Sequence, residues 1–157
     1  MKVVVVYYSR GGTTKKMAEL IGGHISSGGI DTDVVAVADI NAKQLLDYDG
    51  IIIGSPTYYG TLAADLKKLI DESVSLHGKL DGKVAGAFSS SANLAGGNET
   101  TILSILEGLL IHGMIIQGDW QGDHYGPVAL GSVDQRVEEN CERFAQRFVE
   151  LLNKVVL

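Results

Sequence analysis

The sequence predicts an α/β fold of three layers, in which a parallel five-stranded sheet is covered by helices on both faces. Runs of β-branched and aromatic residues alternate five times with segments whose apolar residues recur at helical spacing, as in repeated strand–helix–strand units. The chain has 157 residues and shows no linker, internal repeat or low-complexity tract. We therefore expect residues 1–157 to form one domain.

The chain opens with a strand and a helix. Val3–Tyr8 is a continuous β-branched and aromatic run, which is typical of a strand buried on both faces. Apolar residues spaced three and four apart then predict a helix over 17–25, which Gly28 and Gly29 end. Val34–Ala38 follows as the second strand.

The middle of the chain holds a link, a strand and a helix. The link over 39–49 is expected to be a loop with one weak helical turn at Ala42–Leu46. Ile51–Gly54 is the third strand, because it is an unbroken β-branched run introduced by turn residues. Apolar residues over 62–70 recur at helical spacing and predict the next helix.

The second half of the chain continues the alternation. Lys83–Ser89 is the fourth strand, a long apolar helix covers 102–110, and Met114–Gln117 is the fifth strand. An amphipathic helix over 137–152 closes the chain. The sequence therefore predicts right-handed crossovers between parallel strands, with helices on both faces.

Composition excludes several classes of protein. The net charge of −6 argues against nucleic acid or an anionic membrane as the main partner. The apolar run at the amino terminus is too short for a membrane span, and no cleavage site follows it, so we expect a cytoplasmic protein without membrane insertion. The single Cys141 allows no internal disulfide, and its helical spacing indicates a packing residue. No metal site is expected.

Three unusual loops follow the first, third and fourth strands. In parallel sheets a ligand lies off the carboxyl ends of the strands, where the strand order reverses. The segments at that edge are Ser9–Thr14, Ser55–Gly60 and Ser90–Gly97. They should therefore carry the chemistry.

The first loop suits a phosphate group. Ser9–Thr14 leaves a buried strand and opens a helix, with hydroxyls at both ends and Gly11 and Gly12 between them. It has the spacing of neither a Walker A loop nor a dinucleotide fingerprint. A turn capped by Thr13 or Thr14 is the structural alternative, but such a turn needs only one hydroxyl. The loop resembles the phosphate loop of flavodoxins, with Gly11 in place of one hydroxyl residue.

The second loop suits a flat aromatic ring. Tyr58 and Tyr59 offer stacking surfaces, Pro56 stiffens the loop, and Gly60 permits a positive φ where a peptide must face the ring. Residues 47–60 resemble the D-Y-D-x-I-I-x-G-x-P-T-x-x-G stretch of NAD(P)H:quinone oxidoreductases related to the tryptophan-repressor-binding protein. Residues 88–102 resemble their F-[ST]-S-T-G-T-x-x-G-G-Q-E-T-T-I, and residues 110–114 their L-x-H-G-M.

This resemblance implies a flavodoxin-like fold with strand order 2-1-3-4-5 and FMN bound without a covalent bond. It implies NAD(P)H and a quinone-like acceptor, or a redox protein, as partners, and a possible homo-oligomer. His112 would lie beside the ring, although a histidine at a helix C-terminus is also favoured by the dipole. The expected cofactor-binding residues are Ser9, Arg10, Gly11, Gly12, Thr13, Thr14, Pro56, Thr57, Tyr58, Tyr59, Gly60, Ser90, Ser91, Ala92, Asn93, Leu94, Ala95, His112 and Tyr125.

The chain departs from those oxidoreductases in three places. It has no room for their insertion after the second strand, and its late loop at 120–126 is shortened. The stretch 75–79 lacks their tryptophan. Two functions therefore remain open. In flavodoxins, which are electron carriers, the third loop brings an aromatic over the ring, whereas Ser90–Ala95 has none. An uncovered face favours hydride transfer and so an enzyme, with the flavin rather than a side chain carrying the chemistry. Cover of that face by Trp120, Tyr125 or a partner subunit is the open alternative.

Overall fold

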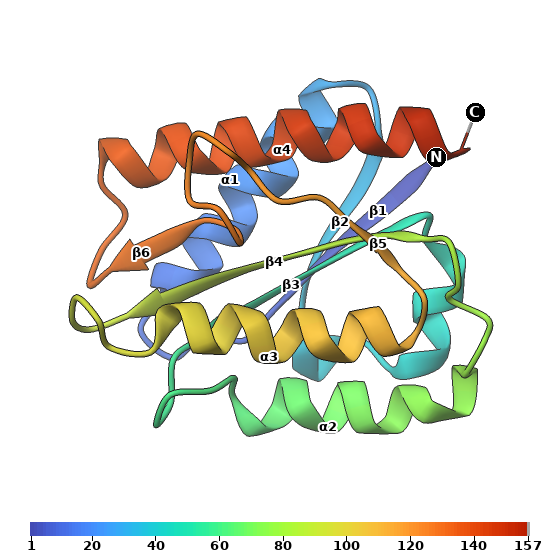
Figure 1. Cartoon of the computed structure of the whole chain (residues 1–157), viewed down its shortest axis with the longest axis horizontal. Coiled ribbons are helices and arrows are strands. Elements are labelled where there is room, and N and C mark those ends of the chain that lie inside the picture. Colours follow the sequence, from blue (N-terminus) through green and yellow to red (C-terminus); the bar gives the residue numbers. More distant parts are fainter. Residues whose placement is uncertain (157) are drawn as a thin grey trace.

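The computed structural model describes residues 1–156 and consists of alternating strands and helices (Figure 1). Three short 3₁₀ helices accompany them. In chain order the elements are β1 (Lys2–Tyr7), α1 (Thr13–Ser27), β2 (Asp31–Ala36), η1 (Val37–Asp39), η2 (Ala42–Asp47), β3 (Gly50–Pro56), α2 (Ala64–Glu72), η3 (Ser73–Leu76), β4 (Val84–Ser91), α3 (Asn98–Ile111), β5 (Ile115–Ile116), β6 (Val128–Leu130) and α4 (Gln135–Val156).

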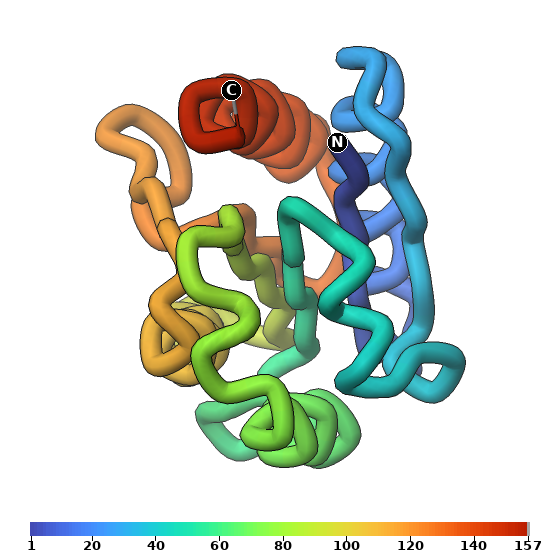
Figure 2. Tube along the Cα trace, turned by 90° about the vertical axis from the view of Figure 1, so that its right-hand side faces the viewer, coloured from blue at the N-terminus to red at the C-terminus, as the bar shows by residue number. Residues whose placement is uncertain are grey.

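The strands form one parallel sheet with the path β2-β1-β3-β4-β5, as predicted. Helices α1 and α4 cover one face and α2 and α3 cover the other, so the three-layer α/β fold is confirmed (Figures 1 and 2). Viewed end-on, α4 lies above the strands and α2 below them (Figure 2). No helix among residues 1–156 is both long and apolar enough to cross a membrane.

The central strands carry apolar residues at successive positions because each strand faces two cores. Val3 and Val5 of β1 pack toward α1 and α4, whereas Val4 and Val6 pack toward α2 and α3. Cys141 of α4 is fully buried in the first of these cores, and burial raises the pKa of its thiol to about 12. Cys141 is therefore a packing residue, as expected.

The edge strand β2 begins earlier than predicted. It covers Asp31–Ala36 instead of 34–38, because its register on β1 pairs Lys2 with Asp31. Its first residues are polar, and Lys2 Nζ lies 2.9 Å from a carboxylate oxygen of Asp33. The expected weak turn after β2 is the helix η2, whose N-cap Asn41 forms a capping box with Gln44.

A sixth strand was not predicted. β5 pairs with Val84 and Ala85 of β4, and β6 pairs with β4 further along, opposite 89–91. Between β5 and β6 the chain leaves the sheet over residues 117–127, which we call the excursion. The run Val128–Leu130 is too short to be distinguished from loop by periodicity alone, which is why β6 was missed.

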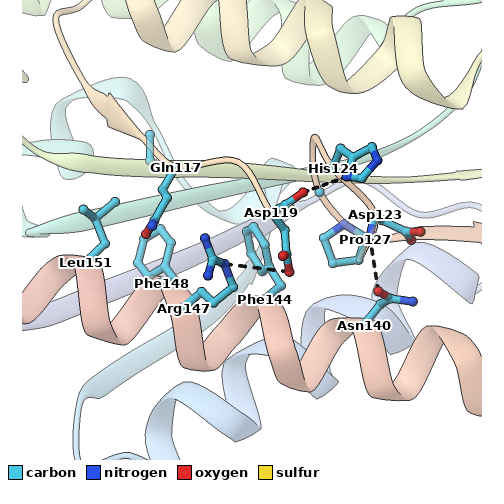
Figure 3. A pocket seen from close by; sticks show the side chains of 12 residues that line it. Gln117, Asp119, Asp123, His124, Pro127, Asn140, Phe144, Arg147, Phe148 and Leu151 are labelled. Atoms are coloured by element: carbon cyan, nitrogen blue, oxygen red, sulfur yellow. Dashed lines mark hydrogen bonds and ion pairs between the residues drawn. The ribbon is translucent and has the colours of Figure 1, made fainter. Parts of the chain in front are cut away.

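Side chains of α4 hold the excursion in place, among them Arg147 at Asp119 and Asn140 at Asp123 (Figure 3). Arg143 makes two bonds to Asp119, at 2.5 and 2.7 Å, and Arg136 contacts Asp123 at 2.9 Å. At the return to the sheet, a Cβ on Gly126 would lie 2.0 Å from the carbonyl oxygen of Ala87, so only glycine fits there. The cavity under the excursion is about 20 Å³, room for little more than one water molecule.

Candidate functional site

A cleft of about 500 Å³ opens at the carboxyl ends of β1, β3 and β4. This is the edge at which the sequence predicted the chemistry, and all but one of the lining residues were expected there. The cleft is lined by Ser9, Arg10, Gly11, Thr13, Thr14, Pro56, Thr57, Tyr58, Ser90, Ser91, Ala92 and Gly131.

The N-terminus of α1 forms one end of the cleft. Its N-cap is Gly12, with a φ of 96° and no side-chain cap, so the alternative of a threonine-capped turn is wrong. Ser9 Oγ accepts a bond of 3.1 Å from the Gly12 amide and closes the loop. The first amides of α1 have no intrahelical partners, and the helix dipole adds positive potential. This end of the cleft therefore suits an anion.

The two threonines of the loop play different parts. Thr13 donates its hydroxyl to the carbonyl oxygen of Gly131 at 2.8 Å, so that proton is already committed. Thr14 is buried, and its Oγ1 lies 2.9 Å from Ser90 Oγ. The hydrogen bond between these two hydroxyl groups uses the proton of one of them. The proton of the other hydroxyl remains available, so Thr14 and Ser90 together keep one donor for a ligand.

Gly131 is the lining residue that the sequence analysis missed. It follows β6 directly, and its amide donates to the carbonyl oxygen of Ser91 at 2.8 Å. The rule that ligands lie off the carboxyl ends of strands applies to it as to the other loops. A prediction of β6 would have found it.

The second loop is a tight turn. Tyr58 and Thr61 exchange backbone bonds of 2.9 and 3.2 Å, and both central residues have positive φ, 49° at Tyr59 and 83° at Gly60. The positive φ expected for Gly60 is confirmed, and the pair matches a type I′ turn. For Tyr59 the left-handed conformation costs about 1 kcal/mol. Its side chain is fully exposed and free to stack on a ligand.

Tyr58 forms the aromatic wall of the cleft. Its ring packs edge-on against Tyr8, with centroids 6.0 Å apart and planes at 78°. Burial, and then the neighbouring Tyr8, raises the pKa of the Tyr58 phenol, so the hydroxyl stays protonated at neutral pH. Tyr58 therefore offers both an apolar face and a donor.

A row of hydroxyls fixes the floor beside this wall. Thr57 Oγ1 lies 3.2 Å from Ser89 Oγ and 3.0 Å from Thr101 Oγ1. These bonds hold the Thr57 side chain and link β3, β4 and α3 behind the cleft.

The third loop contributes its first three residues, Ser90, Ser91 and Ala92, to the cleft. Ser91 Oγ donates to the carbonyl oxygen of Asn93 at 3.0 Å and accepts from Asn98 Nδ2 at 3.1 Å, which fixes its course. Asn93, Leu94 and Ala95 do not line the cleft, and Leu94 is largely exposed. No aromatic side chain from this loop stands over the cleft.

Tyr125, which was also predicted to bind the cofactor, does not line the cleft. It lines a second groove, of about 340 Å³, with Leu94, Ile102 and Leu130. This groove lies between the excursion, β6 and the start of α3, so Tyr125 faces the side of the third loop away from the cleft. A short-range motif match did not reveal that the excursion turns this side chain aside.

His112 is at the wrong end of the molecule for its predicted role beside a ring. It is the C-cap of α3, whose 14 residues separate it by about 20 Å from the loop at the other end. Ser73 donates to the Ile70 carbonyl and accepts from His112 Nε2, 2.7 Å away, while Nδ1 has no partner among the described residues. Burial, and then His77, lowers the pKa of His112. Within this chain His112 therefore contacts the segment that follows α2 and not the cleft.

The donor set of the cleft fits a flat ring that carries a phosphate. One end offers helix amides, hydroxyls and Arg10, and none of the lining residues has a carboxylate that would repel a dianion. The other end offers Tyr58 in the wall and Tyr59 at the rim. FMN has this shape and charge.

Comparison with known proteins agrees with this geometry. A family model described as "Flavodoxin domain" matches residues 4–110. A flavodoxin of Clostridium saccharobutylicum is 31% identical over 99% of both chains. An NAD(P)H dehydrogenase (quinone) of Sinorhizobium fredii is 38% identical over 74% of this chain and 70% of its own. A solved flavodoxin from the domain Archaea superposes with a TM-score of 0.82 at 28% identity, covering 98% of this chain and 99% of its own.

Proposed function

The chain belongs to the flavodoxin family, whose members bind FMN, and from this premise we propose that it uses FMN to move electrons from NAD(P)H to a quinone-like acceptor. When bound, FMN supplies the hydride and electron chemistry. The protein's own residues bind and orient the cofactor and control what reaches it.

The cleft divides this work between its two ends. The amides at the start of α1, with Ser9, Thr14 and Ser90, would hold the phosphate. Tyr58 and the backbone of residues 90–92 would hold the ring. Because most of these donors are backbone amides and hydroxyls, phosphate binding relies little on charged side chains.

One observation carries the choice of an oxidoreductase. The side chains of residues 92–95 in the third loop are aliphatic or polar. Of these four residues, Ala92 alone lines the cleft. A nicotinamide must bring its reacting carbon to about 3–3.5 Å from the flavin, so an aromatic over the ring would exclude it. An open outer side supports direct hydride transfer.

A second function, an electron carrier, is favoured by length. The flavodoxin relative matches this chain end to end, at 99% of both, whereas the quinone dehydrogenase extends beyond it. A carrier exchanges electrons at the ring edge with a partner protein and needs no nicotinamide site.

Anaerobic mixing separates the two functions. We expect the visible absorbance of the FMN-loaded protein to bleach on addition of NADH or NADPH and to return on addition of a small quinone. A protein that takes up FMN but is reduced only by a chemical reductant would be a carrier.

A substitution in the third loop provides the converse test. Asn93→Tyr supplies the missing aromatic and should slow bleaching by NAD(P)H at least tenfold while FMN stays bound, a barrier increase of about 1.4 kcal/mol. Asn93→Ala is the matched control, because it changes the same side chain without adding a ring. Equal bleaching rates in the two variants would count against the open-face argument.

A further inference from the structure

The turn at 58–61 and the loop at 92–97 meet at the start of α3. A Cβ built on Gly97 would lie 2.9 Å from Cα of Gly60 and 3.1 Å from Cγ2 of Thr57, so the two segments are in backbone contact. Both segments adjoin the cleft. Because they touch each other at the start of α3, this contact sets the distance between them.

Thr100, on the first turn of α3, bonds to both segments. Its Oγ1 lies 2.7 Å from the carbonyl oxygen of Gly60 and 2.9 Å from that of Gly97. A hydroxyl has one proton, so the two carbonyls share it.

The two carbonyls do not depend on Thr100 equally. The Gly97 carbonyl also accepts from Thr101, through its hydroxyl at 2.8 Å and its amide at 3.0 Å. For the Gly60 carbonyl, Thr100 is the one donor found within residues 1–156. Removal of the hydroxyl would therefore release the turn and leave the start of α3 bonded.

The turn is a segment that needs such a tether. Tyr59 and Gly60 both have positive φ, and a bulky residue keeps that conformation only where its surroundings impose it. One helical turn after Thr100, Ser104 Oγ lies 3.1 Å from Thr61 Oγ1 and provides a second, weaker attachment.

We propose that Thr100 is a positioning residue of the cofactor site. Its hydroxyl holds the Tyr59–Gly60 turn against α3, and this fixes the wall that carries Tyr58 at a set distance from the third loop. Thr100 does not line the cleft, so it acts through the turn rather than on the ligand. The inference rests on the proposed FMN function.

Three variants test the proposal. Thr100→Val removes the hydroxyl and keeps the shape, and Thr100→Ser keeps the hydroxyl. Thr32→Val is the matched control, because Thr32 lies on the remote strand β2 and its hydroxyl likewise donates to a backbone carbonyl, that of Ile30. Amide hydrogen exchange in the FMN-free proteins would be followed at Tyr58 and Thr61. The affinities of FMN and riboflavin would be measured by fluorescence quenching.

For Thr100→Val we expect exchange at Tyr58 and Thr61 to rise, and both ligands to bind about fivefold more weakly, as for one hydrogen bond of ordinary net strength. The two ligands should weaken alike because the turn serves the ring and not the phosphate. Core amides of β1 should exchange as before. Thr100→Ser should restore all these values, and Thr32→Val should leave them unchanged.

Several results would overturn the proposal. They are unchanged exchange in Thr100→Val, faster exchange with unaltered affinity for both ligands, or failure of Thr100→Ser to restore them. If the unmodified protein takes up no FMN, the proposed function itself fails and the cofactor role of Thr100 fails with it, which is seen before any variant is compared.

Discussion

Single residues decide which end of the cleft holds which part of the ligand. Thr14 and Ser90 retain one donor proton between them, whereas the proton of Thr13 is committed to Gly131. A hydroxyl donor to a charged group contributes about 1.5–3 kcal/mol. The three hydroxyls are thus not equivalent, although they are similar in the sequence.

Thr14→Val should weaken FMN binding about tenfold or more while affecting riboflavin little, since only FMN carries the phosphate. Thr13→Val is the control and should cause a smaller loss. Titration of the FMN-free protein with both ligands measures this. Equal weakening of FMN and riboflavin by Thr14→Val would show that the loop does not hold the phosphate.

His112 gives a pH dependence at the residue scale. Its pKa is lowered in the folded protein by burial, and next by His77, whereas in the unfolded chain it is about 6.5. The unfolded state therefore binds more protons below that pH, and the free energy of unfolding should fall as the pH drops through 6.5 toward the lowered value.

Urea unfolding of the protein and of His112→Gln between pH 5 and 7.5 checks this dependence. The glutamine variant should lose the part of the slope that His112 contributes. A slope identical in both proteins would mean that His112 titrates normally in the folded state.

At the scale of elements, the excursion depends on α4. Arg143 donates to Asp119 and holds the pKa of that carboxyl well below its usual range, and Arg147 forms a second ion pair with the same carboxylate. The pair therefore stabilises the fold at neutral pH, and its contribution is lost only as the pH falls below about 4 toward the lowered pKa.

Asp119→Asn should lower the free energy of unfolding by about 1–2 kcal/mol, less than for a fully buried pair because Arg143 stays one-third exposed. Asp71→Asn, which breaks the exposed pair with Lys67 on α2, is the control and should cost at most about 0.5 kcal/mol. Urea unfolding at pH 7 compares them. Equal effects would mean that the excursion is not anchored by Asp119.

Elements buried on both faces could be predicted from the sequence, and elements at the margin could not. β1, β3 and β4 are covered by helices on each side, so each contains a run of buried apolar residues: 3–6, 51–53 and 84–88. β2 is an edge strand with polar residues at its start, and β6 has three residues, so neither carries a distinct periodic pattern. The missed strand β6 and the largest shift of a strand boundary, that of β2, both lie at the sheet's edges, whereas the bounds of β3 and β4 differ by one or two residues.

The same contrast holds for the candidate site. The loops that follow predicted strands lie at the cleft, because the carboxyl ends of parallel strands share one edge of the sheet. His112 and Tyr125 were placed by motif alone, and a motif does not state which end of a helix, or which side of a loop, a residue occupies. Gly131 was missed with its strand.

For the whole molecule, assembly remains a prediction. We expect a dimer or larger, since the third loop leaves the outer side of the cleft open and a neighbouring subunit often completes that edge in the oxidoreductases that the sequence resembles. Light scattering at high protein concentration measures the mass. A clean monomer would contradict this expectation.

The split between β5 and β6 bears on how freely this chain can change length. Each of the two strands pairs with its own residues of β4. The pairing of either strand therefore does not depend on the length of the excursion at its tip around Trp120. The entropy of closing a loop grows slowly, by about 0.6 kcal/mol for each doubling of its length. Residues added at this tip would therefore cost little and would leave the strand that leads to Gly131 in place. The molecule can vary here without disturbing its cleft.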